Sequence, residues 1–299
     1  TKHKICLLRF RLTYNFYYIM DFYVFFIVLF SAVLHAMWNS MASNYKNKNV
    51  SIPAIVYGHV PACIVAVIIL PLPSIESVPY IILSAIIHQG YQNFLLTAYQ
   101  TGKFTTVYPV ARGFGPLVAT IISIVFLGVY LKVFTLLSIL LISSGVILIG
   151  VFSKSVIRNY KILYTSLATG LFIGIYSVVD GYGARISDSA ISYMSWVFIL
   201  SALIFPLVLK MRKQKNILKK TLTEGKKVFW IGGFFSYIAY VITVWAFTKA
   251  PVPMVSALRE SSILVALFIG YFYMKEKINL YKVIAIILIF VGVIGLKLF

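Results

Sequence analysis

Apolar runs of about 20 residues follow one another along this chain from Asp21 to its end, and they constrain its fold more than any other feature. One such run, as a helix, crosses the roughly 30 Å hydrocarbon core of a bilayer. Hydrophobic residues make up 61% of the 299 residues and charged residues only 11%. A soluble domain cannot bury that much apolar surface, so we predict an all-α integral membrane protein.

The runs predict ten transmembrane helices, most of them joined by short connections. We place these helices near residues 22–42, 52–72, 77–100, 105–128, 131–152, 163–185, 189–209, 227–248, 253–274 and 278–298. Two connections are more polar than the others, at residues 154–161 and 210–227. The first lies at the middle of the chain, so we divide the chain into residues 21–152, a linker at 153–162, and residues 163–299.

The two halves repeat each other at a fixed offset. Arg112 aligns with Arg259 and Gly145 with Gly292, because 259 − 112 and 292 − 145 both equal 147. A unit of five helices has an odd number of crossings, so its second copy enters the membrane from the opposite side. Inverted repeats are typical of secondary transporters, because exchanging the conformations of the two halves opens a central site to each side in turn.

Basic residues greatly outnumber acidic ones, 27 to 7, which gives a formal net charge of +20. They lie in the connections between apolar runs, which is the pattern of cytoplasmic loops near anionic lipid and not of nucleic-acid binding. We therefore expect a small-molecule substrate and membrane lipids as partners and no nucleic acid; a homodimer is compatible with the sequence. More Lys and Arg lie on the side of the first connection, with Lys46 and Lys48, so the charges place both termini outside the cytoplasm.

Residues 1–20 form a basic, aromatic-rich extension, and Met20 is a candidate native start of the chain, which leaves the native status of residues 1–19 open. A cleaved signal peptide is the alternative. The apolar segment 22–42 exceeds the roughly 7 to 15 residues of a signal core, so we interpret it as the first helix. Abundant Ile, Lys, Asn, Phe and Tyr favour an AT-rich bacterial genome, and hence the bacterial cytoplasmic membrane.

Ionisable side chains inside the predicted helices are the main functional candidates, because a charge in the bilayer costs several kcal/mol. Arg112 and Arg259 lie at similar depths in the fourth and ninth helices, one toward each end of a central cavity. We expect Asp180 and Glu260 as partners of Arg259. Asn39, at the comparable position in the first helix, is neutral, so Arg112 lacks a protein counter-ion and suits a substrate carboxylate or phosphate. Asp180, Arg259 and Glu260 are then candidates for a gate or coupling site.

Structural roles are the alternatives for these groups. The arginines can snorkel to an interface or bond to carbonyls freed by Pro109 and Pro116. Asp180 and Glu260 can form a structural ion pair or a proton-coupling site. In the sixth helix, Gly170 and Gly174 form a GxxxG pair that predicts close helix packing.

Polar and aromatic side chains around the proposed cavity complete the candidate site, since aromatic rings stack on rings or cations. The remaining candidates for substrate binding are Asn39, Trp38, His35, Tyr99, Tyr108, Tyr176, Tyr240 and Trp245. His35, His59 and His88 lack metal-ligand spacing, and we interpret them as core or cavity residues. No catalytic, phosphate-binding or metal motif is found in the sequence, so we predict no enzymatic activity, cofactor or metal.

Four segments, in order and at matching spacing, resemble the EamA family of the drug/metabolite transporter superfamily. They are LHAMWN (34–39), AYQTGKFTTVYPVARGFGP (98–116), VVDGYGARIS (178–187) and KAPVPMVSALRESS (249–262). The resemblance implies two inverted five-helix EamA repeats around a central cavity, with alternating access. Members transport amino acids, other metabolites or toxic compounds, often by exchange or proton coupling. Some similar sequences are associated with phosphonate use, and the family is often drawn with both termini in the cytoplasm, opposite to the charge count.

Two functions follow as expectations. The first is a secondary transporter that moves a small anionic or zwitterionic metabolite, amino-acid-like or phosphonate-like, across the cytoplasmic membrane. The alternative is a proton-coupled multidrug exporter of lipophilic cations that uses Asp180 or Glu260 as its membrane carboxylate. A membrane scaffold or enzyme without translocation is a third class, which the inverted repeat disfavours, although fold alone does not establish function.

Overall fold

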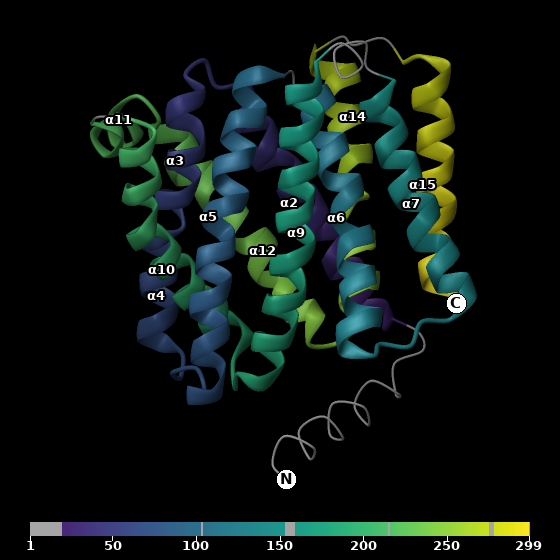
Figure 1. Ribbon diagram of the computed structural model, residues 1–299, viewed down its shortest axis with the longest axis horizontal. Coiled ribbons are helices and arrows are strands. Elements are labelled where there is room, and N and C mark those ends of the chain that lie inside the picture. The colour runs from purple at the N-terminus through teal and green to yellow at the C-terminus, as the bar shows by residue number, and fades with distance from the viewer. Residues whose placement is uncertain (1–19, 103, 153–158, 215, 275–277, 299) are drawn as a thin grey trace.

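The computed structural model describes residues 20–102, 104–152, 159–214, 216–274 and 278–298, and these residues fold almost entirely into helices (Figure 1). The helices are α2 (Phe22–Asn44), α3 (Lys48–Gly58), α4 (Val60–Ile69), α5 (Val78–Thr101), α6 (Phe104–Leu127), α7 (Val133–Val151), α9 (Tyr160–Ile186), α10 (Ala190–Met211), α11 (Ile217–Thr223), α12 (Gly233–Phe247), α13 (Val252–Arg259), α14 (Ser262–Met274) and α15 (Leu280–Leu298). A short 3₁₀ turn at Ile75–Ser77 precedes α5, and a π turn at Val228–Gly232 precedes α12. Most of these bounds lie within a few residues of the predicted ones.

Nine helical segments in the described part of the chain are long and apolar enough to cross a membrane. The protein is therefore a multi-pass membrane protein, as predicted. The predicted third helix corresponds to α5, which has 24 residues but is not among the nine. Its polar residues His88, Gln89 and Gln92 lower its hydropathy, and all three are buried against other helices.

Two predicted helices are interrupted. The second is divided at His59 into α3 and α4, where Pro61 at the start of α4 cannot donate a backbone hydrogen bond. The ninth is divided into α13 and α14 by a turn at Glu260 and Ser261, whose amides bond to the carbonyls three residues before them. This turn places two charged residues, Arg259 and Glu260, in the interior of the molecule.

Two glycines allow α9 of the second half to pack closely against α6 of the first. A Cβ at Gly170 of α9 would lie 2.6 Å from the carbonyl oxygen of Ala111 in α6, and one at Gly174 would lie 2.5 Å from the Cβ of Val118. Neither position can take a side chain without moving the α6 backbone or a core residue. The prediction that Gly170 and Gly174 serve close packing is confirmed.

Helix contacts in the two halves correspond to each other. In the first half, α5 and α6 pack against α9; in the second, α12 with α13 and α14 packs against α2. The helices α7 and α15 pack together at one edge of the molecule, and α4 packs with α10 at the other (Figure 1).

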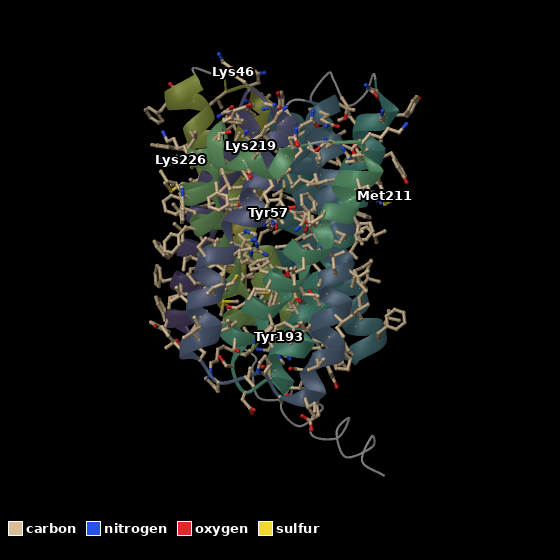
Figure 2. All side chains as sticks on the ribbon, turned by 90° about the vertical axis from the view of Figure 1, so that its left-hand side faces the viewer. Lys46, Tyr57, Tyr193, Met211, Lys219 and Lys226 are labelled. Carbon is tan, nitrogen blue, oxygen red and sulfur yellow. The ribbon has the colours of Figure 1, made fainter. Side chains whose placement is uncertain are left out.

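The start of α2 and the end of α15 mark one face of the molecule. The Nζ of Lys297 in α15 donates a hydrogen bond to the carbonyl oxygen of Met20 at 2.9 Å, so α2 begins where α15 ends. We call this the terminal face. Lys46, Lys219 and Lys226 lie together at the opposite end, which we call the basic face (Figure 2).

Candidate functional site

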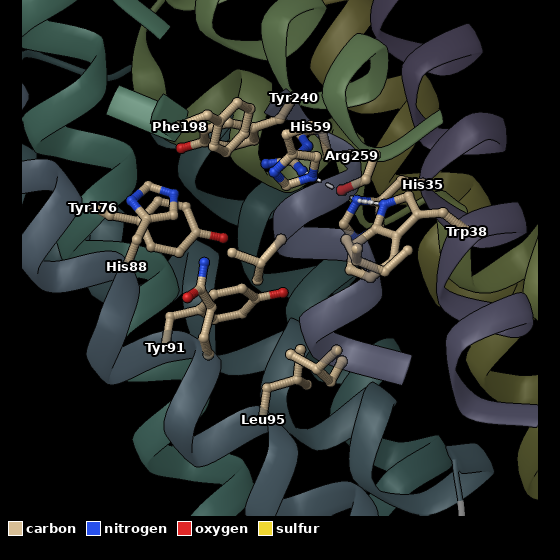
Figure 3. A pocket seen from close by; sticks show the side chains of 15 residues that line it. His35, Trp38, His59, His88, Tyr91, Leu95, Tyr176, Phe198, Tyr240 and Arg259 are labelled. Atoms are coloured by element: carbon tan, nitrogen blue, oxygen red, sulfur yellow. Dashed lines mark hydrogen bonds between the residues drawn. The ribbon is translucent and has the colours of Figure 1, made fainter. Parts of the chain in front are cut away.

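A cavity lies between the helices of the two halves (Figure 3). Its volume of about 50 Å³ has room for a few water molecules. It is lined by His35, Trp38, Ile52, Ile55, Val56, His59, His88, Tyr91, Gln92, Leu95, Tyr176, Phe198, Ser236, Tyr240 and Arg259. Histidine, aromatic and aliphatic side chains thus form most of the wall, and Arg259 is the charged residue among them.

The cavity extends toward the basic face. Its aliphatic wall comes from Ile52 and Ile55 in the first turns of α3 and from Leu95 near the end of α5, and both of these helix ends lie near the basic face. Toward the terminal face, by contrast, side chains such as Phe247 and Met254 are fully packed.

Arg259 ends α13, and its side chain is only 2% exposed. Its guanidinium carbon lies 5.1 Å from the centre of the Tyr240 ring, and Nη2 lies 3.4 Å from Nδ1 of His35. In the described part of the chain no carboxylate oxygen lies within 4.0 Å of it, and its Nε has no hydrogen-bond partner. The prediction that Asp180 and Glu260 partner Arg259 is therefore wrong.

Glu260 instead binds Arg112 of α6. The Nε of Arg112 donates a hydrogen bond to Oε2 at 2.9 Å, and Nη2 contacts Oε1 at 2.7 Å as an ion pair outside hydrogen-bond alignment. The two side chains are 4% and 2% exposed. The prediction that Arg112 lacks a protein counter-ion is wrong, because the turn after Arg259 directs the next side chain toward α6. Arg112 and Glu260 do not line the cavity.

Asp180 of α9 is fully buried among hydroxyl groups. It accepts a hydrogen bond from Tyr240 at 2.6 Å and another from Tyr193 at 3.2 Å. No cationic nitrogen lies within 4.0 Å of it in the described part of the chain. Tyr240 therefore connects two of the predicted residues, since its ring contacts Arg259 and its hydroxyl binds Asp180.

His35 lies near both arginines and interacts electrostatically with each of them. Its Nδ1 faces the indole Nε1 of Trp38 at 3.2 Å as well as Arg259, and its Nε2 lies 3.1 Å from Nδ2 of Asn39. Because all three neighbours are donors, the ring is neutral and not an imidazolium. Asn39 donates to the His35 carbonyl at 2.9 Å and accepts from the Tyr99 hydroxyl at 3.0 Å. These bonds hold the His35 ring at the cavity wall.

The structure brings five of the predicted site residues to the cavity: His35, Trp38, Tyr176, Tyr240 and Arg259. Asn39, Tyr99 and Tyr108 lie behind this wall, and the Tyr108 hydroxyl bonds to Ser262 at 3.0 Å. Trp245 is not among the lining residues; it contacts Tyr23, with ring centres 6.0 Å apart.

Further lining residues were not predicted as site residues. His59 and His88 line the cavity, and the His88 ring stacks on Tyr176 at 4.3 Å. Gln92, Phe198 and Ser236 also line it. In the sequence, the polar residues His88, Gln89 and Gln92 within an otherwise apolar helix were the signal that α5 faces the interior of the protein. In the described residues no group of three His, Cys, Asp or Glu is arranged to hold a metal ion.

Comparison with known proteins agrees with this geometry. Residues 160–298 match the model of the EamA-like transporter family. This part of the chain belongs to the EamA family. The resemblance found in the sequence is thereby confirmed for the EamA domain, which includes Asp180, Tyr240, Arg259 and Glu260.

Most of the chain also shares its fold with solved structures. One, titled only "Crystal structure of protein", has a TM-score of 0.68 and 14% sequence identity to this chain, and the alignment covers 91% of this chain and 94% of that one. At this identity the likeness shows the fold alone, and it includes the first half, which precedes the EamA match. No curated protein matches the chain.

Proposed function

We propose that this protein is a secondary transporter of a small anionic or zwitterionic metabolite, whose anionic group binds Arg259. The observation that carries this proposal is the guanidinium of Arg259, buried at the cavity wall without a carboxylate within 4.0 Å in the described residues. A buried charge without a partner is costly, so a ligand anion is the group that completes the site. The planar fork of arginine suits carboxylates and related oxyanions.

Other atoms of the wall suit the remainder of such a ligand. Oε1 of Gln92 and Nε2 of His59 are buried without hydrogen-bond partners, and both residues line the cavity. The rings of Tyr91 and Tyr176 lie beside them, 5.4 Å apart, and can contact an ammonium group or an apolar side chain. These groups support a zwitterion or a polar monoanion over a purely apolar ligand.

The proposed transporter has ten membrane helices in two inverted five-helix repeats. The start of α2 and the end of α15 meet at Met20 and Lys297, which favours an even number of crossings between them, and α5 added to the nine apolar spans of the described residues makes ten. The paired contacts of the two halves also support it. Two equivalent hydrogen bonds support it as well: Tyr99 donates to Asn39 in the first half, and Tyr240 donates to Asp180 in the second. Both residues of the second bond lie 141 positions after their counterparts in the first, because 180 − 39 and 240 − 99 both equal 141. Alternating access follows from such an architecture.

The alternative of a lipophilic-cation exporter has less support. The charged residue that lines the cavity is a cation, which repels a cationic cargo. The two carboxylates this alternative needs are both engaged, Asp180 by tyrosine hydroxyls and Glu260 by Arg112, and neither lines the cavity.

The test is ligand-dependent stability of the purified protein in lipid nanodiscs. Monocarboxylates, amino acids, sulfonates, phosphonates and lipophilic cations are compared for the wild type, Arg259→Gln and a control, Lys226→Gln, which removes a charge at the basic face. A ligand at 100 times its dissociation constant stabilises the folded state by about 2.7 kcal/mol.

We expect stabilisation by anions or zwitterions that Arg259→Gln abolishes and Lys226→Gln retains. The stabilising compound is then used for flux into liposomes that contain only this protein. Stabilisation by lipophilic cations alone, unchanged in Arg259→Gln, would overturn the proposal, as would anion binding that survives the loss of Arg259.

A further inference from the structure

Three buried charged side chains lie together beside the cavity. Arg259 and Glu260 are consecutive at the turn between α13 and α14, and Arg112 reaches them from α6. All three are almost completely buried and interact electrostatically with one another. Two guanidinium groups and one carboxylate give this cluster a formal net charge of +1.

No other charged group cancels this surplus at the cavity wall. His35 lies near both arginines, but its two ring nitrogens face only donor groups, those of Trp38 and Arg259 at Nδ1 and that of Asn39 at Nε2, so the ring is neutral and not a third cation. Asp180 binds the hydroxyls of Tyr240 and Tyr193, and the ring of Tyr240 separates it from Arg259. In the described part of the chain, the positive charge of Arg259 is thus the one that no carboxylate contacts.

We propose that Glu260, through its ion pair with Arg112, limits the site to a ligand group with a single negative charge. The inference rests on the proposed function and deepens it: the anionic group is a carboxylate or sulfonate and not a doubly charged phosphate or phosphonate. A monoanion neutralises the cluster, whereas a dianion leaves a buried surplus of negative charge, which is costly in an interior of low dielectric constant. In this conformation Glu260 and Arg112 do not line the cavity and so do not touch the ligand; they set the charge that it must carry.

Methanesulfonate and sulfate test this proposal directly. Both are tetrahedral sulfur oxyanions of similar size, and they differ by one unit of charge. Their dissociation constants are measured by titration of the protein in nanodiscs, with stability or tryptophan fluorescence as the signal, since Trp38 lines the cavity. The ratio of the two constants reports charge selectivity independently of overall affinity.

Four proteins vary the formal charge of the cluster: the wild type (+1), Glu260→Gln (+2), Arg112→Gln (0) and the double variant with both changes (+1). We expect the wild type to bind methanesulfonate at least about tenfold more tightly than sulfate, and Glu260→Gln to lower that preference at least about tenfold, given an effective dielectric constant of about 20. Arg112→Gln should weaken binding of both anions. The double variant should regain the wild-type preference to within about threefold, because the two charge changes cancel.

Recovery of the wild-type anion preference in the double variant separates an effect of charge from an effect of packing. A structural defect caused by one substitution would not be repaired by removing the second side chain of the pair. Single variants leave one buried charge unpaired and can fail to fold. Gln92→Lys then serves in place of Glu260→Gln, because it adds a positive charge at the wall without touching the pair, and it must shift the preference toward sulfate.

The outcomes distinguish the two proposals. If the wild type binds no anion of the panel, the proposed function fails. If it binds methanesulfonate through Arg259 but its preference for methanesulfonate over sulfate stays the same in both Glu260→Gln and Gln92→Lys, the charge-balance inference is overturned while the proposed function stands.

Discussion

The hydroxyl of Tyr240 connects Asp180 to the cavity, and a single substitution isolates its contribution. The Oη of Tyr240 donates to Oδ2 of Asp180 at 2.6 Å, while the ring lies 5.1 Å from the guanidinium carbon of Arg259. Tyr240→Phe removes the first interaction and keeps the ring for the second. Asp180 then retains the Tyr193 hydroxyl, which lies 3.2 Å away.

The geometry gives the expected magnitude. A hydroxyl-to-oxygen distance of 2.6 Å falls in the range of roughly 2.5 to 2.7 Å that is typical of bonds to an ionised carboxylate. Removal of such a bond costs about 1.5 to 3 kcal/mol, so we expect Tyr240→Phe to lower the free energy of unfolding by about 2 kcal/mol. Tyr193→Phe removes a longer bond and should cost about 1 kcal/mol or less.

The assay is reversible unfolding in mixed micelles, performed as a double-mutant cycle with Asp180→Asn. The amide of this variant has the shape of the carboxylate but no charge, so the Tyr240 hydroxyl can still donate to it. In the D180N background, Tyr240→Phe should therefore cost only about 1 kcal/mol, as for a neutral hydrogen bond. The difference between the two backgrounds measures the charge-assisted part.

Two results would refute this reasoning. Equal losses in both backgrounds would mean that Asp180 is protonated in the folded protein and that the short distance does not reflect an ionised group. A loss below about 0.5 kcal/mol in the wild-type background would mean that the Tyr240 hydroxyl does not stabilise the fold, and its role would be confined to the ring under Arg259.

Three further predictions concern packing, orientation and the basic face. Gly170→Ala should lower the free energy of unfolding by about 1 to 3 kcal/mol, because its Cβ would lie 2.6 Å from a backbone oxygen of α6, whereas Leu171→Ala at the exposed side of α9 should cost less. A cysteine at Lys219, in a cysteine-free background, should react with a membrane-impermeant maleimide only from the cytoplasmic side; reaction in intact cells would reverse the orientation given by the charges. Arg212→Gln should accelerate amide exchange at the end of α5 severalfold, because Arg212 donates to the side chain of Asn93 at 2.7 Å; unchanged exchange would deny it that role.

Much of the fold followed from the sequence because hydropathy and helix length are local properties. The contact of α9 with α6 was also predictable, since Gly170 and Gly174 recur at the spacing of one helix face. The break between α13 and α14 was not. A turn at Glu260 and Ser261 satisfies its backbone within three residues, and no proline or glycine marks it.

The partners of the buried charges could not be assigned from the sequence either, because they depend on this unmarked turn. Adjacent residues on a helix do not face each other, so the neighbours Arg259 and Glu260 point to different surroundings. Depth in the membrane grouped Asp180 with Arg259 correctly, but the contact passes through Tyr240 and is not an ion pair. Sequence identified the charged residues and their depth, whereas the direction of each side chain depended on tertiary packing.

The two halves differ in the charge at equivalent positions, and this bears on the proposed transport cycle. At the offset of 147 that relates Arg112 to Arg259, the counterpart of Glu260 is Gly113, since 260 − 147 = 113. An exchange of conformations between the halves would bring Arg112 to the cavity wall and withdraw Arg259, while the single carboxylate stays within the cluster. The formal charge would then be +1 in both states. A monoanion would find one uncompensated guanidinium on each side of the membrane, so it could be bound and released without any change in the charge of the protein.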